Sequence, residues 1–186
     1  MTKNNIIVAV VGLCGAGKSE ATQVFIDNKF EKVYFGDVTF DEMKRQNLPI
    51  TPDNERKIRE ALRATSDMAI YAKKSEPKIK EFYEQGKNVV VESLYSWSEY
   101  KYLKEIYKDK FKLLAIVTDR DLRAERLKTR PLRPLTDEQV TTRDYTEIEN
   151  IEKAGPIAIA DHFVLNNEDM DSLKSKVQQY IDSLLG

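Results

Sequence analysis

The chain has 186 residues, 41% of them hydrophobic and 33% charged, which is typical of one folded domain and excludes a disordered segment. The net charge of −1 gives no reason to expect binding to nucleic acid or to a membrane. The single cysteine, Cys14, rules out a disulfide within the chain, and the apolar run near the N-terminus is too short for a signal peptide, so we expect a cytoplasmic protein.

Short apolar runs alternate with helical patterns along the chain. The runs that predict β-strands lie at residues 6–11, 32–35, 88–93, 112–119 and 161–167. Helices are predicted at residues 19–28, 38–46, 51 to about 74, 77–86, 97–108, 122–129, 136–153 and 170–185. Thr51 and Pro52 mark one helix start, and Pro77 either kinks that helix or begins the next.

This alternation favours a parallel sheet with helices on both faces. We therefore predict an α/β, three-layer fold with a five-stranded parallel sheet. No linker divides the chain, so we expect a single domain over residues 1–186, with helical insertions at about 38–86 and about 128–150.

The segment 12–19 reads GLCGAGKS and matches the phosphate-binding pattern G-x-x-x-x-G-K-[ST]. It follows a predicted buried strand and opens a predicted helix, as the pattern requires. Glycines let backbone N–H groups turn toward phosphate oxygens, Lys18 can reach the β- and γ-phosphates, and the Ser19 hydroxyl can bind Mg²⁺. We expect ATP and Mg²⁺, with nucleotide contacts from Gly12, Cys14, Gly15, Ala16, Gly17, Lys18, Ser19 and Glu20. For Cys14 a reactive thiol and a small tolerated side chain both remain open.

Switch GTPases, mechanical ATPases and small-molecule kinases share this P-loop. A switch GTPase normally carries D-x-x-G after a later strand, and this chain has no D-x-x-G. A kinase needs positive charge and exclusion of water around the transferred group, which a mobile arginine-rich lid supplies. Segment 119–143 contains six arginines, and Arg123, Arg126 and Arg130 are spaced for one helix face. The alternative is a solvated basic face with local acid partners.

On these motifs the chain resembles the nucleoside monophosphate kinase group, and within it dephospho-coenzyme A kinase and the archaeal-type kinase-like proteins related to it. The resemblance covers almost the whole chain. Beside the P-loop it includes FGDVTFDEM, VVVES, RAERLKTR with RDYTEIE, and the terminal IAIADHFVLNNEDMDSLKSKV. It implies a P-loop kinase fold with a helical acceptor-binding insertion and an arginine-rich lid.

The resemblance implies roles for two carboxylates that end predicted strands. Asp37 matches an acid that faces the acceptor or the magnesium water, and as a general base it would take a proton from an acceptor hydroxyl. Glu92 matches an acid that holds Mg²⁺ through water and belongs to the acceptor side of the site. Helix capping is the alternative for Asp37, and a helix-start acid near Ser93 or Ser96 is the alternative for Glu92.

It also implies roles for lid residues and for the last strand. Arg126 and Arg130 match catalytic lid arginines, with Arg126 also on the nucleotide, while Arg133 and Arg143 belong to the acceptor side. Asn166 ends the last predicted strand, where these families contact the adenine base.

The chain departs from adenylate kinases at two positions. Phe40 stands where they have an arginine for the monophosphate, and no arginine follows Glu92 closely. Arg59 and Arg63, spaced i, i+4, could supply acceptor-phosphate contacts instead, or pair with the nearby acids Glu55 and Glu60.

Two further features favour structural roles. The aromatic residues at 95–102 could stack on an acceptor base, but covering the sheet is the favoured interpretation. His162 is expected to fill a strand edge. The leading hypothesis is thus ATP-dependent phosphoryl transfer to a small nucleotide-like acceptor, either a nucleoside monophosphate or dephospho-coenzyme A. The alternative is a nucleotide-dependent regulatory or binding module that hydrolyses ATP slowly and has no small acceptor. The sequence does not predict an oligomeric state.

Overall fold

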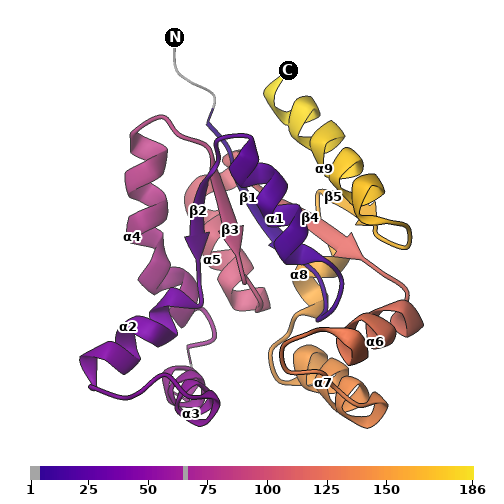
Figure 1. The fold of residues 1–186 in the computed structure, drawn as a ribbon. Helices are drawn as coiled ribbons and strands as arrows, with labels where there is room; N and C mark the ends of the chain where they lie inside the picture. Colours follow the sequence, from indigo (N-terminus) through magenta and orange to yellow (C-terminus); the bar gives the residue numbers. More distant parts are fainter. Residues whose placement is uncertain (1–4, 65–66) are drawn as a thin grey trace.

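The computed structural model describes residues 5–64 and 67–186. In this part of the chain, five strands form one parallel sheet in the order β2-β3-β1-β4-β5 (Figure 1). The strands are β1 (Ile7–Val11), β2 (Glu31–Tyr34), β3 (Val89–Glu92), β4 (Phe111–Val117) and β5 (His162–Leu165). The predicted α/β class and five-stranded parallel sheet are confirmed.

Helices connect successive strands and cover the sheet. They are α1 (Lys18–Asp27), α2 (Asp37–Arg45), α3 (Pro52–Arg63), α4 (Ile70–Glu84), α5 (Trp97–Tyr107), α6 (Arg120–Thr129), α7 (Asp137–Glu149), α8 (Ala154–Ala158) and α9 (Met170–Leu185), with a 3₁₀ turn, η1 (Lys108–Lys110), before β4. None of the helices in the described residues is long and apolar enough to cross a membrane.

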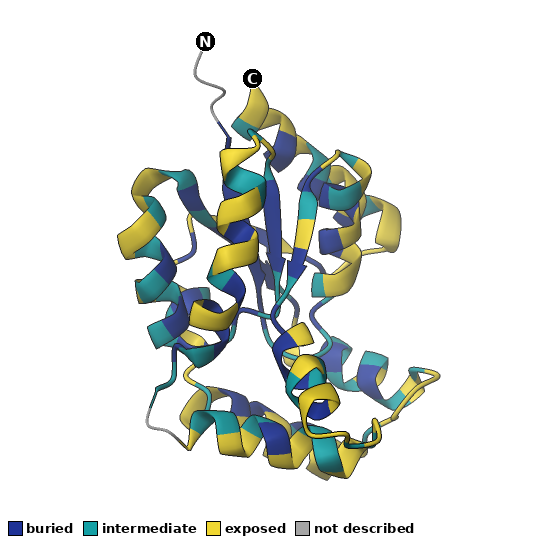
Figure 2. Ribbon diagram, turned by 90° about the vertical axis from the view of Figure 1, so that its left-hand side faces the viewer, coloured by how far each residue is buried: buried dark blue, intermediate teal, exposed yellow. Residues whose placement is uncertain are grey.

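The alternation of side chains along β1 produces two cores, one on each face of the sheet. Val8 and Val10 pack with Phe25 of α1 and Leu173 of α9. Ile7, Ala9 and Val11 pack on the other side with α4 and α5, whose contributions include Ile79 and Leu103. Burial of each large apolar side chain stabilises the fold by about 1.5–3 kcal/mol. Figure 2 shows the strands as the buried centre, with exposed positions on the outer helix surfaces.

The parallel register brings the carboxyl ends of the strands to one edge of the sheet. Glu92 at the end of β3 is paired with Val10 of β1 on one side and with Tyr34 of β2 on the other. The P-loop, α2–α3 and α6–α7 gather at this edge, whereas both termini lie at the opposite end (Figure 1). A ligand site is expected at such an edge of an open parallel sheet.

The first helical insertion differs from the prediction. The helix expected from 51 to about 74 ends at Arg63, and residues 65–66 lie outside the described part of the chain. A separate helix, α4, runs through Pro77 without ending there. A proline inside a helix costs about 3 kcal/mol, and burial of Tyr71 and Ala72 before it and of Ile79 after it offsets this cost.

The second insertion, which is the predicted lid, contains α7. A capping box begins α7, in which Thr136 and Gln139 each satisfy the other's backbone N–H. The helix predicted to reach residue 153 ends at Glu149 and is followed by the short α8. Glu152 has a left-handed backbone (φ 59°), and the Lys153 N–H donates to the Glu147 carbonyl at 3.0 Å. The chain therefore turns away from the axis of α7 after Glu149.

Candidate active site

The P-loop connects β1 to α1, and its conformation requires glycine. Gly12 and Gly17 have φ values of 147° and 96°. A Cβ at Gly12 would lie 2.5 Å from the Ile116 carbonyl oxygen, and a Cβ at Gly17 would lie 2.4 Å from Asn166 Nδ2. Side chains at these positions would therefore displace the loop from the end of the sheet.

Lys18 is held inside the loop that it belongs to. It is the first residue of α1, and its Nζ donates to the Leu13 carbonyl at 2.9 Å. Burial, followed by the positive charge of Lys153, lowers the pKa of Lys18 to about 8. An anion in the loop would favour the charged form of Lys18, so this lysine is suited to phosphate binding.

Ser19 and Glu92, both predicted to serve Mg²⁺, lie in contact. The Ser19 hydroxyl donates to Glu92 Oε1 at 3.1 Å, and Lys32 Nζ pairs with Glu92 Oε2 at 2.6 Å. A hydroxyl and a carboxylate oxygen are the hard ligands that Mg²⁺ prefers, so this pair fits the ion. Ser96 caps α5 together with Glu99, and the capping alternative for Glu92 is therefore wrong.

Asp37 is open to solvent at the same edge of the sheet. It is the first residue of α2, the cap position is Gly36, and its carboxylate lies 4.0 Å from Lys78 Nζ with 52% of the side chain exposed. The capping alternative for Asp37 is thus wrong as well. Burial and the neighbouring Tyr95, Glu92 and Asp37 raise the pKa of Tyr34. These groups therefore share one electrostatic environment.

The two arginines of α3 make contacts within the insertion. Arg59 Nη1 pairs with Glu55 Oε2 at 3.4 Å, as the surface-pairing alternative predicts. The Arg63 guanidinium lies 4.7 Å from the centre of the Tyr71 ring, and its Nε is buried without a hydrogen-bond partner among the described residues. Acceptor binding by both residues stays a prediction.

The arginines of α6 diverge, although their spacing predicts one face. Arg123 is buried, binds Asp144 through two 2.8 Å hydrogen bonds and donates to the Cys14 carbonyl at 3.1 Å. Arg126 lies between the segments that follow β4 and β5, within 3.4 Å of Thr118 Oγ1 and 3.5 Å of the Glu168 carbonyl. The Arg130 Nε donates to the Arg133 carbonyl at 2.6 Å. A common face thus does not bring the three guanidinium groups to one point.

The other two lid arginines reach different partners. Arg133 Nη2 lies 3.5 Å from Glu55 Oε1, so the lid loop contacts α3 across the sheet edge. Arg143 Nε donates to Glu147 Oε1 at 3.2 Å. The Arg133–Glu55 ion pair therefore joins the two insertions at the end of the sheet that carries the P-loop.

Asn166 is placed beneath the P-loop. The residue is 5% exposed, and its side-chain Nδ2 donates to the Ala16 carbonyl at 2.9 Å. The Thr118 hydroxyl lies 3.1 Å from both the Ala16 and the Asn166 carbonyl oxygens and can donate to either. The amide expected to contact adenine thus supports the loop in this structure, because a buried amide must satisfy its own hydrogen bonds.

The favoured interpretations of the aromatic residues and of His162 agree with the packing. Trp97 and Tyr100 stack at 5.1 Å, and Tyr100 packs against the core that covers the sheet. His162 lies on the edge strand β5 and stacks on Tyr180 at 4.5 Å.

Two buried residues near the P-loop, Glu147 and Lys153, were not predicted. The Cys14 N–H donates to Glu147 Oε2 at 3.0 Å, and Lys153 Nζ pairs with Glu147 Oε1 at 2.8 Å. The i, i+4 spacing of Arg143 and Glu147 is a signal for their pairing. No signal in the sequence indicates a contact over the 133 positions between Cys14 and Glu147.

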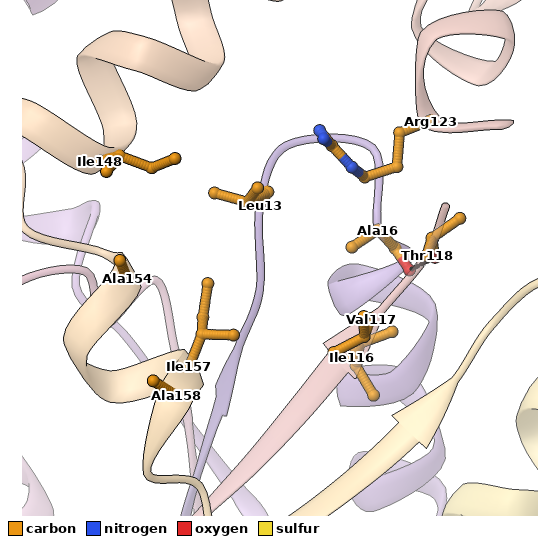
Figure 3. Close-up of a pocket in the computed structure, with 10 residues that line it drawn as sticks. All are labelled: Leu13, Ala16, Ile116, Val117, Thr118, Arg123, Ile148, Ala154, Ile157 and Ala158. Atoms are coloured by element: carbon orange, nitrogen blue, oxygen red, sulfur yellow. Dashed lines mark hydrogen bonds between the residues drawn. The ribbon is translucent and has the colours of Figure 1, made fainter. Parts of the chain in front are cut away.

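An apolar cavity of about 200 Å³ lies beside the loop. Figure 3 shows Leu13 of the P-loop opposite Ile148 of α7 and Ala154 and Ile157 of α8, with Ile116 of β4 below. The cavity therefore lies between the P-loop, the end of β4 and α8.

Together, the parallel sheet, the P-loop at its edge and the helical lid define a P-loop fold of the kinase type. The chain belongs to the AAA domain family, whose model matches residues 8–153. Among its relatives, a protein of Thermococcus gammatolerans is 29% identical, covering 97% of this chain and 96% of its own, and one of Thermococcus kodakarensis is 27% identical, covering 97% and 98%. Both are called UPF0200 protein, a name that states no activity.

Solved structures share the fold. TT1252 of Thermus thermophilus superposes with a TM-score of 0.66 at 16% identity, covering 98% of this chain and 99% of its own. A shikimate kinase of Acinetobacter baumannii, solved in complex with shikimate, gives a TM-score of 0.63 at 13% identity and covers 98% and 94%. At such identities the likeness shows the fold alone.

Proposed function

We propose that this protein transfers the γ-phosphoryl group of ATP to a small nucleotide-like acceptor, either a nucleoside monophosphate or dephospho-coenzyme A. The observation that carries the proposal is the contact between Ser19 and Glu92 beside the buried Lys18. This contact joins a metal-binding hydroxyl of the P-loop to a carboxylate of the neighbouring strand. Such a pair suits the Mg²⁺ that accompanies ATP in phosphoryl transfer.

The chain's own residues supply most of the chemistry. Bound Mg²⁺ would neutralise charge on the β- and γ-phosphates from its place at Ser19 and Glu92. Lys18 would leave the Leu13 carbonyl and bind the phosphates, which favour its charged form. With dephospho-coenzyme A, Asp37 would take the proton of the acceptor hydroxyl while that oxygen bonds to the γ-phosphorus, the bond to the bridging oxygen breaks and ADP leaves. With a nucleoside monophosphate, whose attacking phosphate oxygen carries no proton, Asp37 would orient the acceptor.

The acceptor side is proposed from the positions of α3 and the lid. Arg59 and Arg63 lie on α3, and Arg133 contacts the same helix through Glu55. An acceptor that carries a phosphate would find these guanidinium groups within one insertion and would exchange their intramolecular partners for its own oxygens. The resemblance to dephospho-coenzyme A kinase and its archaeal-type relatives supports the choice of acceptors.

Arg126 is proposed to bind the nucleotide at its base end. It lies between the loops that follow β4 and β5, next to the P-loop support made by Thr118. A planar guanidinium at this position is suited to stack on a base. Asn166 would contribute through the loop that it holds in place.

A regulatory module that hydrolyses ATP slowly without an acceptor is the second candidate. The observation that favours it is the engagement of the acceptor-side arginines with partners of their own, Arg59 with Glu55 and Arg63 with Tyr71. Phe40, in place of an arginine, points the same way.

A product assay tests the two functions against each other. Protein, Mg²⁺ and ATP are incubated with dephospho-coenzyme A and with each ribo- and deoxyribonucleoside monophosphate, and products are separated by chromatography. A phosphorylated acceptor supports the kinase, whereas ATP loss that no acceptor accelerates supports the regulatory module.

Variants locate the chemistry. Lys18→Ala should abolish turnover under either function. Asp37→Asn should lower transfer by about 10²–10⁴-fold if Asp37 is the base, with ATP binding unchanged. The matched control is Asp41→Asn, since Asp41 is exposed on the same helix. Equal transfer by the two variants would remove Asp37 from the mechanism.

A further inference from the structure

Both backbone polar groups of Cys14 are bound, the N–H by Glu147 of α7 and the carbonyl by Arg123 of α6. The Cys14 N–H donates to Glu147 at 3.0 Å, and its carbonyl accepts from Arg123, which holds Asp144. Asp144 and Glu147 are one helical turn apart and so lie on the same face of α7. The lid is therefore docked on the P-loop at a single residue.

Glu147 is a buried anion surrounded by donors. Its side chain is 4% exposed, Oε2 accepts from the Cys14 N–H, and Oε1 pairs with Lys153 Nζ at 2.8 Å and accepts from Arg143 Nε at 3.2 Å. Burial acts to raise its pKa, but the charge and hydrogen bond of Lys153 leave that pKa below the ordinary value. The group is thus a carboxylate inside the loop that binds phosphates.

Lys153 is buried equally deeply, with 5% of its side chain exposed, and its Nζ lies 3.9 Å from the centre of the Tyr95 ring. Its charge also acts on Lys18, which places both ammonium groups near one point. A buried ion pair is weak evidence for a purely stabilising role, because desolvation of both charges offsets their attraction. The positive charges of Lys18, Lys153 and Arg143 act on the Glu147 carboxylate, and together they form a site for an anion.

We propose that Glu147 occupies a phosphate position in the P-loop, and that nucleotide binding displaces it and transfers Lys153 from Glu147 to a phosphate oxygen. The inference rests on the proposed function, since it requires nucleotide at this loop. A phosphate and Glu147 compete for the same Cys14 N–H, and a phosphate offers Lys153 and Arg143 the oxygens that they bind now. Lys153 is then a phosphate-binding residue, and Glu147 sets the affinity of the site.

The test is the affinity for a fluorescent N-methylanthraniloyl derivative of ADP with Mg²⁺, measured by titration. Glu147→Gln should bind it about tenfold more tightly than the wild type, because the competing charge is gone. Glu147→Asp, which keeps the charge for Lys153 but shortens the reach to Cys14, should also bind more tightly. The double variant Glu147→Gln/Lys153→Met should bind about tenfold more weakly than Glu147→Gln. Glu149→Gln, an exposed position on the same helix, should match the wild type.

The outcomes separate this inference from the proposed function. If the wild type binds the probe and neither Glu147 variant binds more tightly, the inference alone is overturned and the pair is structural. If neither the wild type nor the variants bind the probe at millimolar concentration, the proposed function fails, and the inference fails with it. Melting curves of each variant establish folding, and Glu147→Asp keeps the test valid if loss of the charge prevents folding.

Discussion

Glu99 is a buried acid whose ionisation should make the protein less stable as the pH rises. It occupies the third position of α5, where Oε2 accepts from the Tyr95 and Ser96 N–H groups at 2.6 and 2.9 Å. Oε1 is buried and has no hydrogen-bond partner among the described residues. Burial raises the pKa of Glu99 from 4.5 to about 7.

The magnitude follows from linkage between proton binding and folding. Between pH 4.5 and about 7 the folded state binds a proton at Glu99 that the unfolded state does not, so the free energy of unfolding falls as the pH rises. The free energy of unfolding changes by about 1.4 kcal/mol per pH unit, so over the whole interval it falls by about 3 kcal/mol. The contribution is fully present below the unfolded pKa and is lost as the pH passes the folded pKa.

Glu99→Gln tests this expectation, because glutamine keeps the capping box and carries no charge. Urea unfolding of the wild type and the variant should be compared from pH 5 to pH 8. Between pH 5 and pH 8, the free energy of unfolding of the variant should rise by about 2–3 kcal/mol relative to that of the wild type. Glu105→Gln, an exposed position on the same helix, should run parallel to the wild type. A constant difference between Glu99→Gln and the wild type would refute the reasoning.

Three further predictions concern the P-loop and its lid. Arg123→Met should destabilise the protein by about 3–5 kcal/mol in urea unfolding, because it leaves Asp144 buried without the partner that pairs with it. The double variant Arg123→Met/Asp144→Leu should recover most of this loss. Equal stability of the single and double variants would contradict the prediction. Nucleotide affinity should be constant below pH 8 and should fall by up to about tenfold per pH unit above it, because Lys18 must then take up a proton on binding. Lys18→Arg should remove this fall in the same titrations, because arginine stays charged. Ser19→Ala and Glu92→Gln should each raise the Mg²⁺ concentration for half-maximal turnover by about tenfold or more, and an unchanged requirement would exclude that site.

Local sequence patterns predicted the features that depend on neighbouring residues. The apolar runs gave the strands, because a buried parallel strand needs apolar side chains on both faces. The spacing of glycines around Lys18 and Ser19 predicted the P-loop, because backbone curvature is set within a few residues. Two strand-end acids, Asp37 and Glu92, were predicted at the correct edge, because parallel strands share a direction.

Local patterns misplaced features that distant contacts decide. From sequence, Pro77 either kinks a helix or begins the next one, whereas α4 begins at Ile70 and continues past Pro77 to Glu84. Arg123, Arg126 and Arg130 share a helical spacing, but their partners come from α7, from the segment after β4 and from the loop before α7. Contact of Asn166 with the adenine base stays a prediction, whereas its hydrogen bond to the Ala16 carbonyl, which supports the P-loop, is visible only in the structure.

The sequence by itself thus determined the fold class, the P-loop and the residues that could serve ATP and Mg²⁺. Only the tertiary structure decided which of them meet: Ser19 with Glu92 over 73 positions, and Cys14 with Glu147 over 133. The physical reason is that a backbone conformation responds to its nearest neighbours, whereas a charged side chain takes the partner that folding places within hydrogen-bond distance. That choice determined that the lid carries a carboxylate into the P-loop.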